Sequence, residues 1–272
     1  MRNRIVILMA VAVLMITACK RRPEQDKNVI DKPNIEIKDG KLSPEALWSF
    51  GRIGEVSVSP DGKKVLYTLT YYSISENKGN AEIYTMNIDG SDVQRLTTTA
   101  SSEWNVIWNP KGDKIGFIYA DENGVNIYEM NPDGTGRKAI SDLKEGDLEG
   151  FSYSPDGTKV VYVRAVPKQD KYAKLKEGLD KTTGRINDDL AYRHWDNWVD
   201  AIPQPFIADF DGVTIGEGKN ILENTEFESP MRPWGGMEQI TWSPDSKSIA
   251  YTCRKKVGKE YAFSTNSDIY LY

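Results

Sequence analysis

A nine-residue turn motif recurs four times in this chain and limits the folds that are open to it. Its first copy is Ser-Pro-Asp-Gly-Lys-Lys-Val-Leu-Tyr, and the four copies occupy residues 59–67, 109–117, 154–162 and 243–251. Successive copies start 50, 45 and 89 residues apart. Proline presets the backbone of a turn, aspartate bonds to nearby backbone, and glycine accepts the conformation that closes the turn. A repeat of this length indicates a fold built from stacked, similar units.

Short β-branched and aromatic segments flank every copy of the turn, so each copy predicts a β-hairpin. A second hairpin follows at a regular offset, because residues 83–90 (Ile-Tyr-Thr-Met-Asn-Ile-Asp-Gly) correspond to residues 127–134 (Ile-Tyr-Glu-Met-Asn-Pro-Asp-Gly). Two such hairpins form a four-stranded antiparallel sheet, which is one propeller blade. We predict an all-β chain in which residues 42–272 form a partial β-propeller of about four four-stranded blades, the last incomplete. The blades start near residues 50, 104, 150 and 238.

The 89-residue interval points either to a degenerate blade or to an insertion in blade three, and we favour an insertion at residues 167–204. A third strand at residues 205–212 then resumes the repeat with the same Asp-Gly ending. The second half of the insertion is predicted to be helical, capped by Asp188 or Asp189. One face of this helix comprises Leu190, Ala191, Trp195, Trp198 and Val199. Its tryptophans either pack onto the blade, the commoner role for aromatic residues, or belong to a lid that faces a substrate.

The N-terminus has the features of an export signal. Basic residues precede a short apolar run at residues 5–16, which is too short to span a bilayer comfortably. Small residues before Cys19 resemble a bacterial lipobox, and the alternative is an ordinary secretory signal with a chance cysteine. We predict a lipoprotein signal peptide at residues 1–18, lipidation of Cys19 and a polar tether over residues 19–41. The mature chain is then an exported, membrane-anchored lipoprotein of a Gram-negative-type envelope, facing the periplasm.

Composition and single residues exclude several kinds of site. The net charge of −5 comes from 35 basic and 40 acidic residues spread along the chain, which does not suit a nucleic-acid partner. His194 is the only histidine and no Gly-x-Ser-x-Gly motif occurs, so we expect no catalytic residue in this chain. One histidine and two distant cysteines do not predict a zinc site. The Asp-Gly turns do not fit a calcium-binding loop, and we predict no metal and no cofactor.

The repeats resemble the WD40-like repeat of TolB-type propellers, a motif that is specific for the architecture and weak for function. Rarer segments are similar to the propeller of the dipeptidyl-peptidase V family, within the prolyl-oligopeptidase family of serine peptidases. These segments are residues 184–186 (Gly-Arg-Ile), 193–198 (Arg-His-Trp-Asp-Asn-Trp), 205–207 (Pro-Phe-Ile), 233–236 (Pro-Trp-Gly-Gly) and 264–270 (Ser-Thr-Asn-Ser-Asp-Ile-Tyr). The resemblance covers nearly all of the mature chain.

This resemblance implies a larger enzyme, in which a propeller, commonly seven-bladed, caps an α/β-hydrolase domain that carries Ser, Asp and His. Such an enzyme releases dipeptides from the N-termini of peptides, and its propeller excludes folded proteins and helps to position the free amine. The sequence departs from the family pattern because it stops inside blade four, so no catalytic residue is carried over and this chain alone is expected to be inactive. The alternative is a lipid-anchored TolB-like propeller that binds proteins and performs no chemistry.

The amino terminus of a peptide substrate is a cation, so its anchor is expected to be a carboxylate in a partly closed site. The insertion contains aspartates at positions 188, 189, 196 and 200, of which we favour Asp196. It lies between Trp195 and Trp198, which would supply aromatic walls, and beside His194. The competing interpretation of Asp196 is a surface residue in a salt bridge. Asp196, Trp195, Trp198 and His194 are therefore the predicted substrate contacts.

Overall fold

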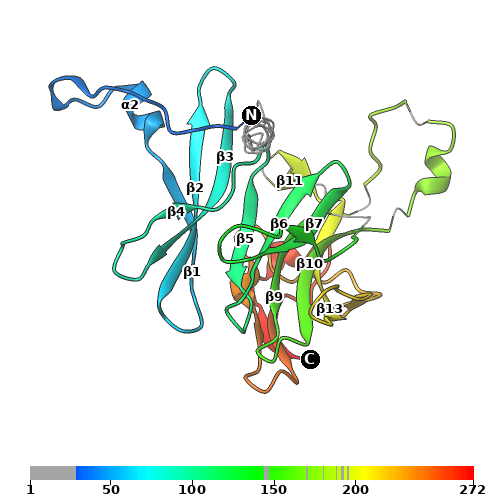
Figure 1. Ribbon diagram of the computed structural model, residues 1–272. Coiled ribbons are helices and arrows are strands. Elements are labelled where there is room, and N and C mark those ends of the chain that lie inside the picture. Colours follow the sequence, from blue (N-terminus) through cyan, green and yellow to red (C-terminus); the bar gives the residue numbers. More distant parts are fainter. Residues whose placement is uncertain are drawn as a thin grey trace, which may run out of the picture.

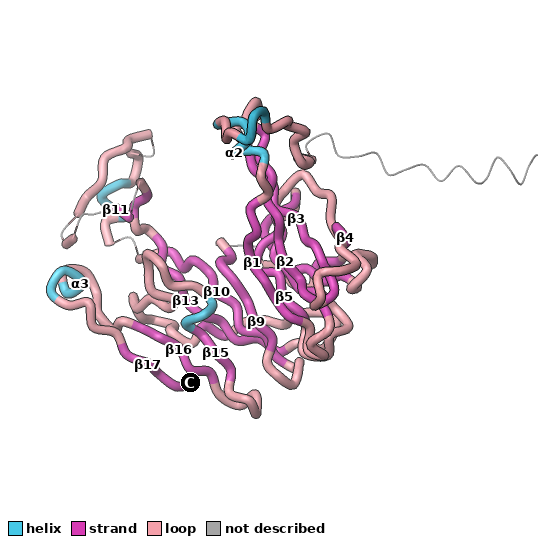
Figure 2. The backbone as a smooth tube through the Cα atoms, turned by 90° about the vertical axis from the view of Figure 1, so that its left-hand side faces the viewer, coloured by secondary structure: helices cyan, strands magenta, loops and turns pink. Residues whose placement is uncertain are grey.

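The computed structural model describes most of the chain after its N-terminal segment. The described residues are 29–143, 147–169, 171–179, 181–187, 189–190, 193–194 and 196–272. The predicted signal peptide, Cys19 and Trp195 lie outside this part of the chain. Figure 1 shows small β-sheets that follow one another along the chain, and Figure 2 shows that these sheets form an open arc.

The first two blades are four-stranded antiparallel meanders, in which strands that are neighbours in sequence also pair in space. Blade one contains β1 (Arg52–Val58), β2 (Lys64–Ser73), β3 (Lys78–Asn87) and β4 (Gln94–Arg95). Blade two contains β5 (Glu103–Trp108), β6 (Ile115–Asp121), β7 (Gly124–Met130) and β8 (Lys138–Ala139). The two predicted hairpins of each repeat therefore combine into one blade.

Blades three and four keep this order of strands. Blade three contains β9 (Leu148–Tyr153), β10 (Lys159–Pro167), β13 (Ala201–Asp209) and β14 (Lys219–Asn220). Within the described residues, blade four has three strands: β15 (Ile240–Trp242), β16 (Ile249–Cys253) and β17 (Asp268–Leu271). These sheets confirm an all-β partial propeller with an incomplete fourth blade. Strand β13 begins before residue 205, its predicted start, because pairing with β10 continues as far as Ala201 opposite Pro167.

The first residue of each turn motif holds the turn with its side chain. In the first copy the Ser59 hydroxyl donates to the Asp61 carboxylate at 2.7 Å and accepts from the Lys64 backbone N–H at 2.9 Å. The side chains of Asn109, Ser154 and Ser243 accept equivalent backbone bonds in the other copies. The fourth copy has Ser246 where the others have glycine, and it still adopts a φ of 61°. The turn is therefore specified by its first residue as well as by proline and glycine.

At each of the three junctions, aromatic residues of the later blade pack with aliphatic residues of the blade before it. The aliphatic residues of the earlier blade are Leu66 and Ile83 at the first junction, Ile118 and Ile127 at the second, and Val161 and Val163 at the third. The aromatic residues of the later blade are Phe117 and Tyr128, then Tyr153 and Tyr162, then Tyr251 and Tyr270. The apolar core is thus a series of similar junctions between blades, which is how stacked repeats bury a continuous core.

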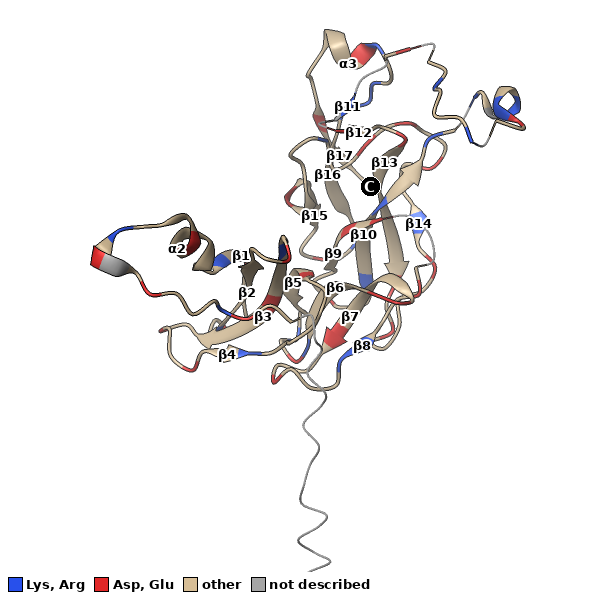
Figure 3. Cartoon of the chain, turned by 90° about the horizontal axis from the view of Figure 1, so that it is seen from above, with Lys and Arg blue, Asp and Glu red and all other residues tan. Residues whose placement is uncertain are grey.

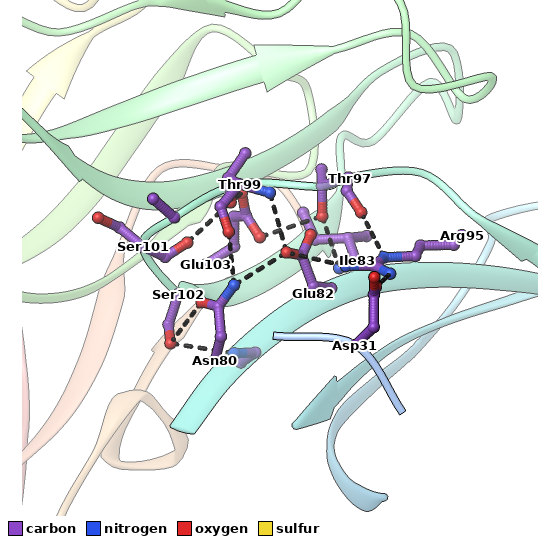
Figure 4. Close-up of polar contacts among 12 residues, drawn as sticks. Asp31, Asn80, Glu82, Ile83, Arg95, Thr97, Thr99, Ser101, Ser102 and Glu103 are labelled. Atoms are coloured by element: carbon purple, nitrogen blue, oxygen red, sulfur yellow. Dashed lines mark hydrogen bonds and ion pairs between the residues drawn. The ribbon is translucent and has the colours of Figure 1, made fainter. Parts of the chain in front are cut away.

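A buried polar network holds the segment that connects blade one to blade two (Figure 4). The Glu82 carboxylate accepts hydrogen bonds from the Asn80 side-chain amide and the Thr99 backbone N–H, both at 2.9 Å. The Glu103 carboxylate accepts from the hydroxyls of Thr97 at 3.1 Å and Thr99 at 2.8 Å. One carboxylate from each blade therefore accepts hydrogen bonds from the same connecting segment.

Two arginines balance the charge of this network. Arg95 lies 3.2 Å from Glu82, and Arg137 lies 3.0 Å from Glu103 and 3.9 Å from the centre of the Tyr119 ring. Burial is the main cause that raises the pKa of Glu103 to about 7, and the charge of Glu82 acts in the same direction. The junction therefore contains a buried carboxyl group that changes its protonation state near neutral pH.

The two edges of the arc differ in their connections. One edge, which we name the turn rim, carries the turns at residues 59–63, 109–114, 154–158 and 243–248. The opposite edge, which we name the loop rim, carries the segment that leads into β1, the insertion at residues 168–200 between β10 and β13, and residues 254–267 between β16 and β17. Figure 2 shows α2 (Pro44–Ser49), β11 (Arg193–His194) and α3 (Glu260–Phe263) on this edge.

The segment before β1 contacts blade one at the loop rim. It contains the 3₁₀-helix η1 (Lys38–Gly40) and α2, whose first turn is capped by the Ser43 hydroxyl, which accepts from the Ala46 N–H at 3.1 Å. The Trp48 ring of α2 packs edge-on against Tyr72 of β2, with ring centres 5.2 Å apart. Further along the chain, a third 3₁₀-helix, η3 (Met237–Gln239), leads into β15.

Strands occupy described residues of the insertion where the sequence suggested a helix over residues 190–199. The described residues there form a short hairpin of β11 and β12 (Asn197–Trp198), in which Arg193 pairs with Trp198. The helix prediction for these residues was wrong because tryptophan is also favoured in strands. Across the hairpin the Arg193 guanidinium lies 4.8 Å from the centre of the Trp198 ring. The helical part of the insertion is instead the 3₁₀-helix η2 (Ala173–Lys176).

Candidate functional site

A cavity of about 770 Å³ opens on the loop rim between blades three and four. The insertion forms one wall, with residues 182–187 and Trp198. The opposite wall contains Glu226 and Glu228 from the connection before β15, together with Tyr261 of α3. This volume is in the range of pockets that bind small molecules. The insertion thus makes the edge of blade three into one wall of a concave site.

Trp198 is positioned on the cavity wall by two arginines. The guanidinium groups of Arg185 and Arg193 lie 4.6 Å and 4.8 Å from the centre of its indole ring. Arg185 also forms an ion pair with Asp200, which lines the same cavity. A guanidinium over an aromatic face is an attractive arrangement. The indole is therefore a fixed aromatic surface of the site.

Glu228 supplies a buried carboxyl group to the opposite wall. Burial raises its pKa to about 6, although Arg254 and Arg232 act in the opposite direction. Beside it, the Glu226 carboxylate lies 3.6 Å from the Lys168 ammonium group. A carboxyl group with a perturbed pKa in a cleft is a common mark of a functional site. The two glutamates thus place carboxyl groups on this wall, with basic groups beside each of them.

The predicted substrate contacts occupy different places. Trp198 lines the cavity. Asp196 is exposed in the turn between β11 and β12, and it is not among the described residues that line the cavity. His194 pairs with Asn197 through β11 and β12, and its side chain lies outside the described part of the structure, as does the whole of Trp195. The role of Asp196 as an anchor stays a prediction.

Other carboxylates lie closer to the cavity than Asp196. Asp189 and Asp200, two of the four aspartates considered from the sequence, line it, whereas Asp188 lies outside the described residues. Sequence reasoning missed Glu228, because its surroundings contain no motif and no periodic pattern. The only available signal is the length of its segment, residues 221–239 between β14 and β15, since long connections often carry function.

Charges of both signs surround this rim (Figure 3). The helix η2 adds Lys174 and Lys176 to the insertion. Among the described residues, no group of three or more His, Cys, Asp and Glu side chains is arranged to hold a metal ion. None of the helices in that same part of the chain is both long and apolar enough to cross a membrane.

Sequence relatives agree with this architecture. The family model of the TolB beta propeller domain matches residues 44–194. The chain is 41% identical over 231 residues to dipeptidyl-peptidase 5 of Porphyromonas gingivalis, which covers 85% of this chain and 34% of that protein. It is 37% identical over 231 residues to dipeptidyl-peptidase 5 of Porphyromonas endodontalis, covering 85% of this chain and 33% of that protein. The chain thus spans about a third of the length of these curated relatives.

Solved structures show the same fold. The acylaminoacyl peptidase of Pyrococcus horikoshii superposes with a TM-score of 0.56 at 16% identity, covering 82% of this chain and 31% of that chain. An acylaminoacyl peptidase in complex with Z-Gly-Gly-Phe-chloromethyl ketone gives a TM-score of 0.58 at 15% identity, covering 83% and 32%. Identities this low show the fold alone. With its repeated turns, its four blades and the match of the family model, the chain belongs to the TolB beta propeller domain family.

Proposed function

We propose that this chain is the substrate-gating propeller portion of an exported serine dipeptidyl-peptidase, whose catalytic domain lies elsewhere in a longer polypeptide. The observation that carries the proposal is the cavity on the loop rim, which is built from an insertion that interrupts the regular spacing of the blades. Similarity over about a third of the length of two dipeptidyl-peptidases supports it. In this role the chain admits peptides and performs no bond cleavage itself.

The chemistry of the cavity suits a short peptide with a free amino terminus. Glu228 and Asp189 offer negative charge to an ammonium group, and Trp198 offers an aromatic surface to a side chain. An ammonium group that leaves water needs a partner of opposite charge. We keep Asp196 as a proposed anchor as well, since the β11–β12 turn that carries it adjoins Trp198. His194 and Trp195 are proposed to contribute to the same contact surface.

The test uses the complete polypeptide that contains this chain, assayed with dipeptidyl substrates that have a free amino terminus. Asp196→Asn and Glu228→Gln are each expected to raise KM several-fold with little change in kcat, because they remove ground-state binding. Asp92→Asn, at an exposed residue of blade one, is the control. Unchanged kinetics for Asp196→Asn would remove that residue from the site. Absence of any dipeptidyl cleavage by the wild type would overturn the proposed function.

We also propose that the chain is anchored to a membrane through a lipid on Cys19, with residues 1–18 removed as a signal peptide. The support is the lipobox-like sequence and the basic, then apolar, N-terminus. Cys19→Ala should abolish incorporation of labelled fatty acid and move the protein from the membrane fraction to the soluble fraction. Retention of the label in this variant would disprove lipidation at this cysteine.

A second candidate function is a propeller that binds proteins without chemistry. The match of the TolB family model favours it, since that family is defined by the propeller and not by a catalytic domain. The dipeptidyl assay on the complete polypeptide separates the two candidates. Specific cleavage supports the peptidase, whereas capture of an envelope protein without any cleavage supports the binding module.

A further inference from the structure

Glu228 differs from the other buried glutamates of the described chain because its carboxylate has no partner. Four glutamates are buried there, at positions 82, 103, 129 and 228. Glu82 and Glu103 each accept hydrogen bonds and lie beside an arginine, and Glu129 accepts from the Tyr153 hydroxyl at 2.8 Å. Within the described residues, the carboxylate of Glu228 has neither a hydrogen bond nor an ion pair. A buried carboxyl group without a partner is costly, so the fold alone does not account for Glu228.

The backbone holds Glu228 at the cavity between blades three and four. Glu228 pairs with Arg254, the residue after β16, through an isolated antiparallel bridge. The next residue, Ser229, donates its backbone N–H to the Pro203 carbonyl of β13 at 3.0 Å. Glu228 is 5% exposed and lines the cavity. Its carboxyl group is therefore fixed between two blades at the surface of the cavity, with little contact with water.

The basic groups around Glu228 face other partners. The charged neighbours come from the connection before β15, from β9, from the insertion and from the end of β16, and they are Arg232, Glu226, Glu149, Lys168 and Arg254. Arg232 lies 3.0 Å from Glu149. Lys168 lies 3.6 Å from Glu226. The Arg254 guanidinium lies 5.1 Å from the centre of the Tyr261 ring. The charge of Glu228 is thus available to a molecule in the cavity.

We propose that a peptide in the cavity places its amino terminus at Glu228, and that this carboxyl group gives up its proton as the ammonium group binds. The O–H bond of the carboxylic acid breaks, its proton leaves to water, and the carboxylate pairs with the ammonium group. Burial raises the pKa of Glu228 to about 6, so mildly acidic solution protonates it in the free protein, and an adjacent cation lowers this pKa again. The exchange rests on the proposed function, because it takes the ligand to be a peptide with a free amino terminus.

Two proton equilibria then set the pH range in which a peptide binds. Below about pH 6 Glu228 is protonated, and above about pH 8 the amino terminus loses its own proton. The Cys253 thiol, also near Glu228, stays neutral over this range because burial raises its pKa to about 11. The acids of the insertion that line the cavity are Asp189 and Asp200, of which Asp200 pairs with Arg185. The affinity should therefore be highest near pH 7.

The experiment is calorimetric titration of the complete polypeptide with alanyl-phenylalanine amide, in buffers of different ionisation enthalpy, which counts the protons released. At pH 5.5 binding should release about three quarters of a proton, and at pH 7 almost none, since the pKa of Glu228 is about 6. The affinity should be about tenfold lower at pH 5 than at pH 7. The N-acetylated form of the same peptide has no cation and should release no proton at either pH.

A matched pair of variants assigns the proton to one residue. Glu228→Gln keeps the shape of the side chain and should abolish both the proton release and the loss of affinity at pH 5. Glu223→Gln, at an exposed residue of the same connection that is not among the described residues lining the cavity, removes the same charge and should keep both effects. If Glu228→Gln does not fold, the wild-type titrations with the free and the acetylated peptide still decide.

The outcomes separate this exchange from the function on which it rests. Proton release that Glu228→Gln leaves unchanged, or tight binding by the wild type at pH 5.5 without proton release, would overturn the role of Glu228 while the peptide site stands. A peptide that neither binds to the wild type nor is cleaved by it would overturn the proposed function, and the proton exchange with it.

Discussion

The turn rim and the loop rim belong to the same blades but are built in different ways. On the turn rim, short connections repeat nearly the same hydrogen bonds, from the Ser59 hydroxyl in blade one to the Ser243 hydroxyl in blade four. On the loop rim, blade three carries the insertion at residues 168–200 and blade four carries residues 254–267. The turn rim therefore has nearly the same structure in every blade, whereas the connections on the loop rim differ from blade to blade.

The difference separates the residues that hold the fold from those that form the site. Substitutions on the turn rim are expected to change stability, since their side chains accept hydrogen bonds from partly buried backbone N–H groups. Substitutions on the loop rim around the cavity are expected to change binding with little effect on folding, since functional residues are often carried by loops on a rigid scaffold. Three changes test this division, and a fourth tests the junction between blades one and two.

Shortening the insertion tests the division between the two rims most strongly. The backbone N–H of Lys168 bonds to the Asp200 carbonyl at 2.8 Å, directly beyond the pairing of Pro167 with Ala201. Replacing residues 169–199 by a two-residue Asn-Gly turn should therefore leave blade three paired and change the free energy of unfolding by less than about 1 kcal/mol. Peptide binding, measured by calorimetry, should be lost. Retained binding, or loss of cooperative unfolding, would break the division between the rims.

The buried network between blades one and two predicts a dependence of stability on pH. The folded chain holds the Glu103 proton more tightly than an unfolded chain does, because the pKa of Glu103 rises from 4.5 to about 7. Its stabilising contribution is therefore complete below pH 4.5 and is lost as the pH rises through about 7, with a magnitude of about 3 kcal/mol.

Glu103→Gln should reduce this loss. Denaturant unfolding at pH 5 and pH 8 should show a smaller difference for the variant than for the wild type. Glu76→Gln, at an exposed residue of blade one, provides the control and should keep the wild-type difference. An equal difference in all three proteins would show that Glu103 is not the group responsible.

A matched pair of glycines compares the rims directly. Gly157 in the third turn has a φ of 69°, which a β-branched residue adopts only with strain, so Gly157→Val should cost about 1–3 kcal/mol. A Cβ atom at Gly184 in the insertion would meet no atom within 4 Å, and Gly184→Val should change stability by less than about 0.5 kcal/mol. Thermal unfolding measures both, and equal costs would contradict the comparison.

The smallest expected effect concerns the side chain of the first turn residue, which forms hydrogen bonds within the turn. The Ser154 hydroxyl accepts from the Lys159 N–H at 2.9 Å and donates to Asp156 at 2.7 Å, so Ser154→Ala should cost about 1 kcal/mol. Thr182→Ala, at an exposed residue of the insertion, should have no measurable effect on the same denaturant curves. A neutral Ser154→Ala would show that proline and glycine alone specify the turn.

The sequence predicts the turn rim well and the loop rim poorly, for a physical reason. Turn chemistry and the Ile-Tyr strands are local patterns, so the blades, their hairpins and the incomplete fourth sheet follow from them. The sequence predicts a helix where β11 and β12 form a hairpin, because a single short segment with two tryptophans fits both periodicities.

The cavity shows the same limit of prediction from the sequence. The sequence predicts Trp198 as a substrate contact, and Trp198 lines the cavity. Glu228 comes from a different connection that only the packing of blade four brings near the insertion.

Photo-cross-linking of a short peptide to the chain, followed by mass spectrometry of the labelled fragments, tests the central claim most directly. The peptide carries a free amino terminus and a photoreactive side chain in its second residue. The account predicts labels in residues 168–200 and 254–263 of the loop rim, with much less labelling when the amino terminus is acetylated. Labels on the turn rim, or labelling that acetylation leaves unchanged, would contradict it.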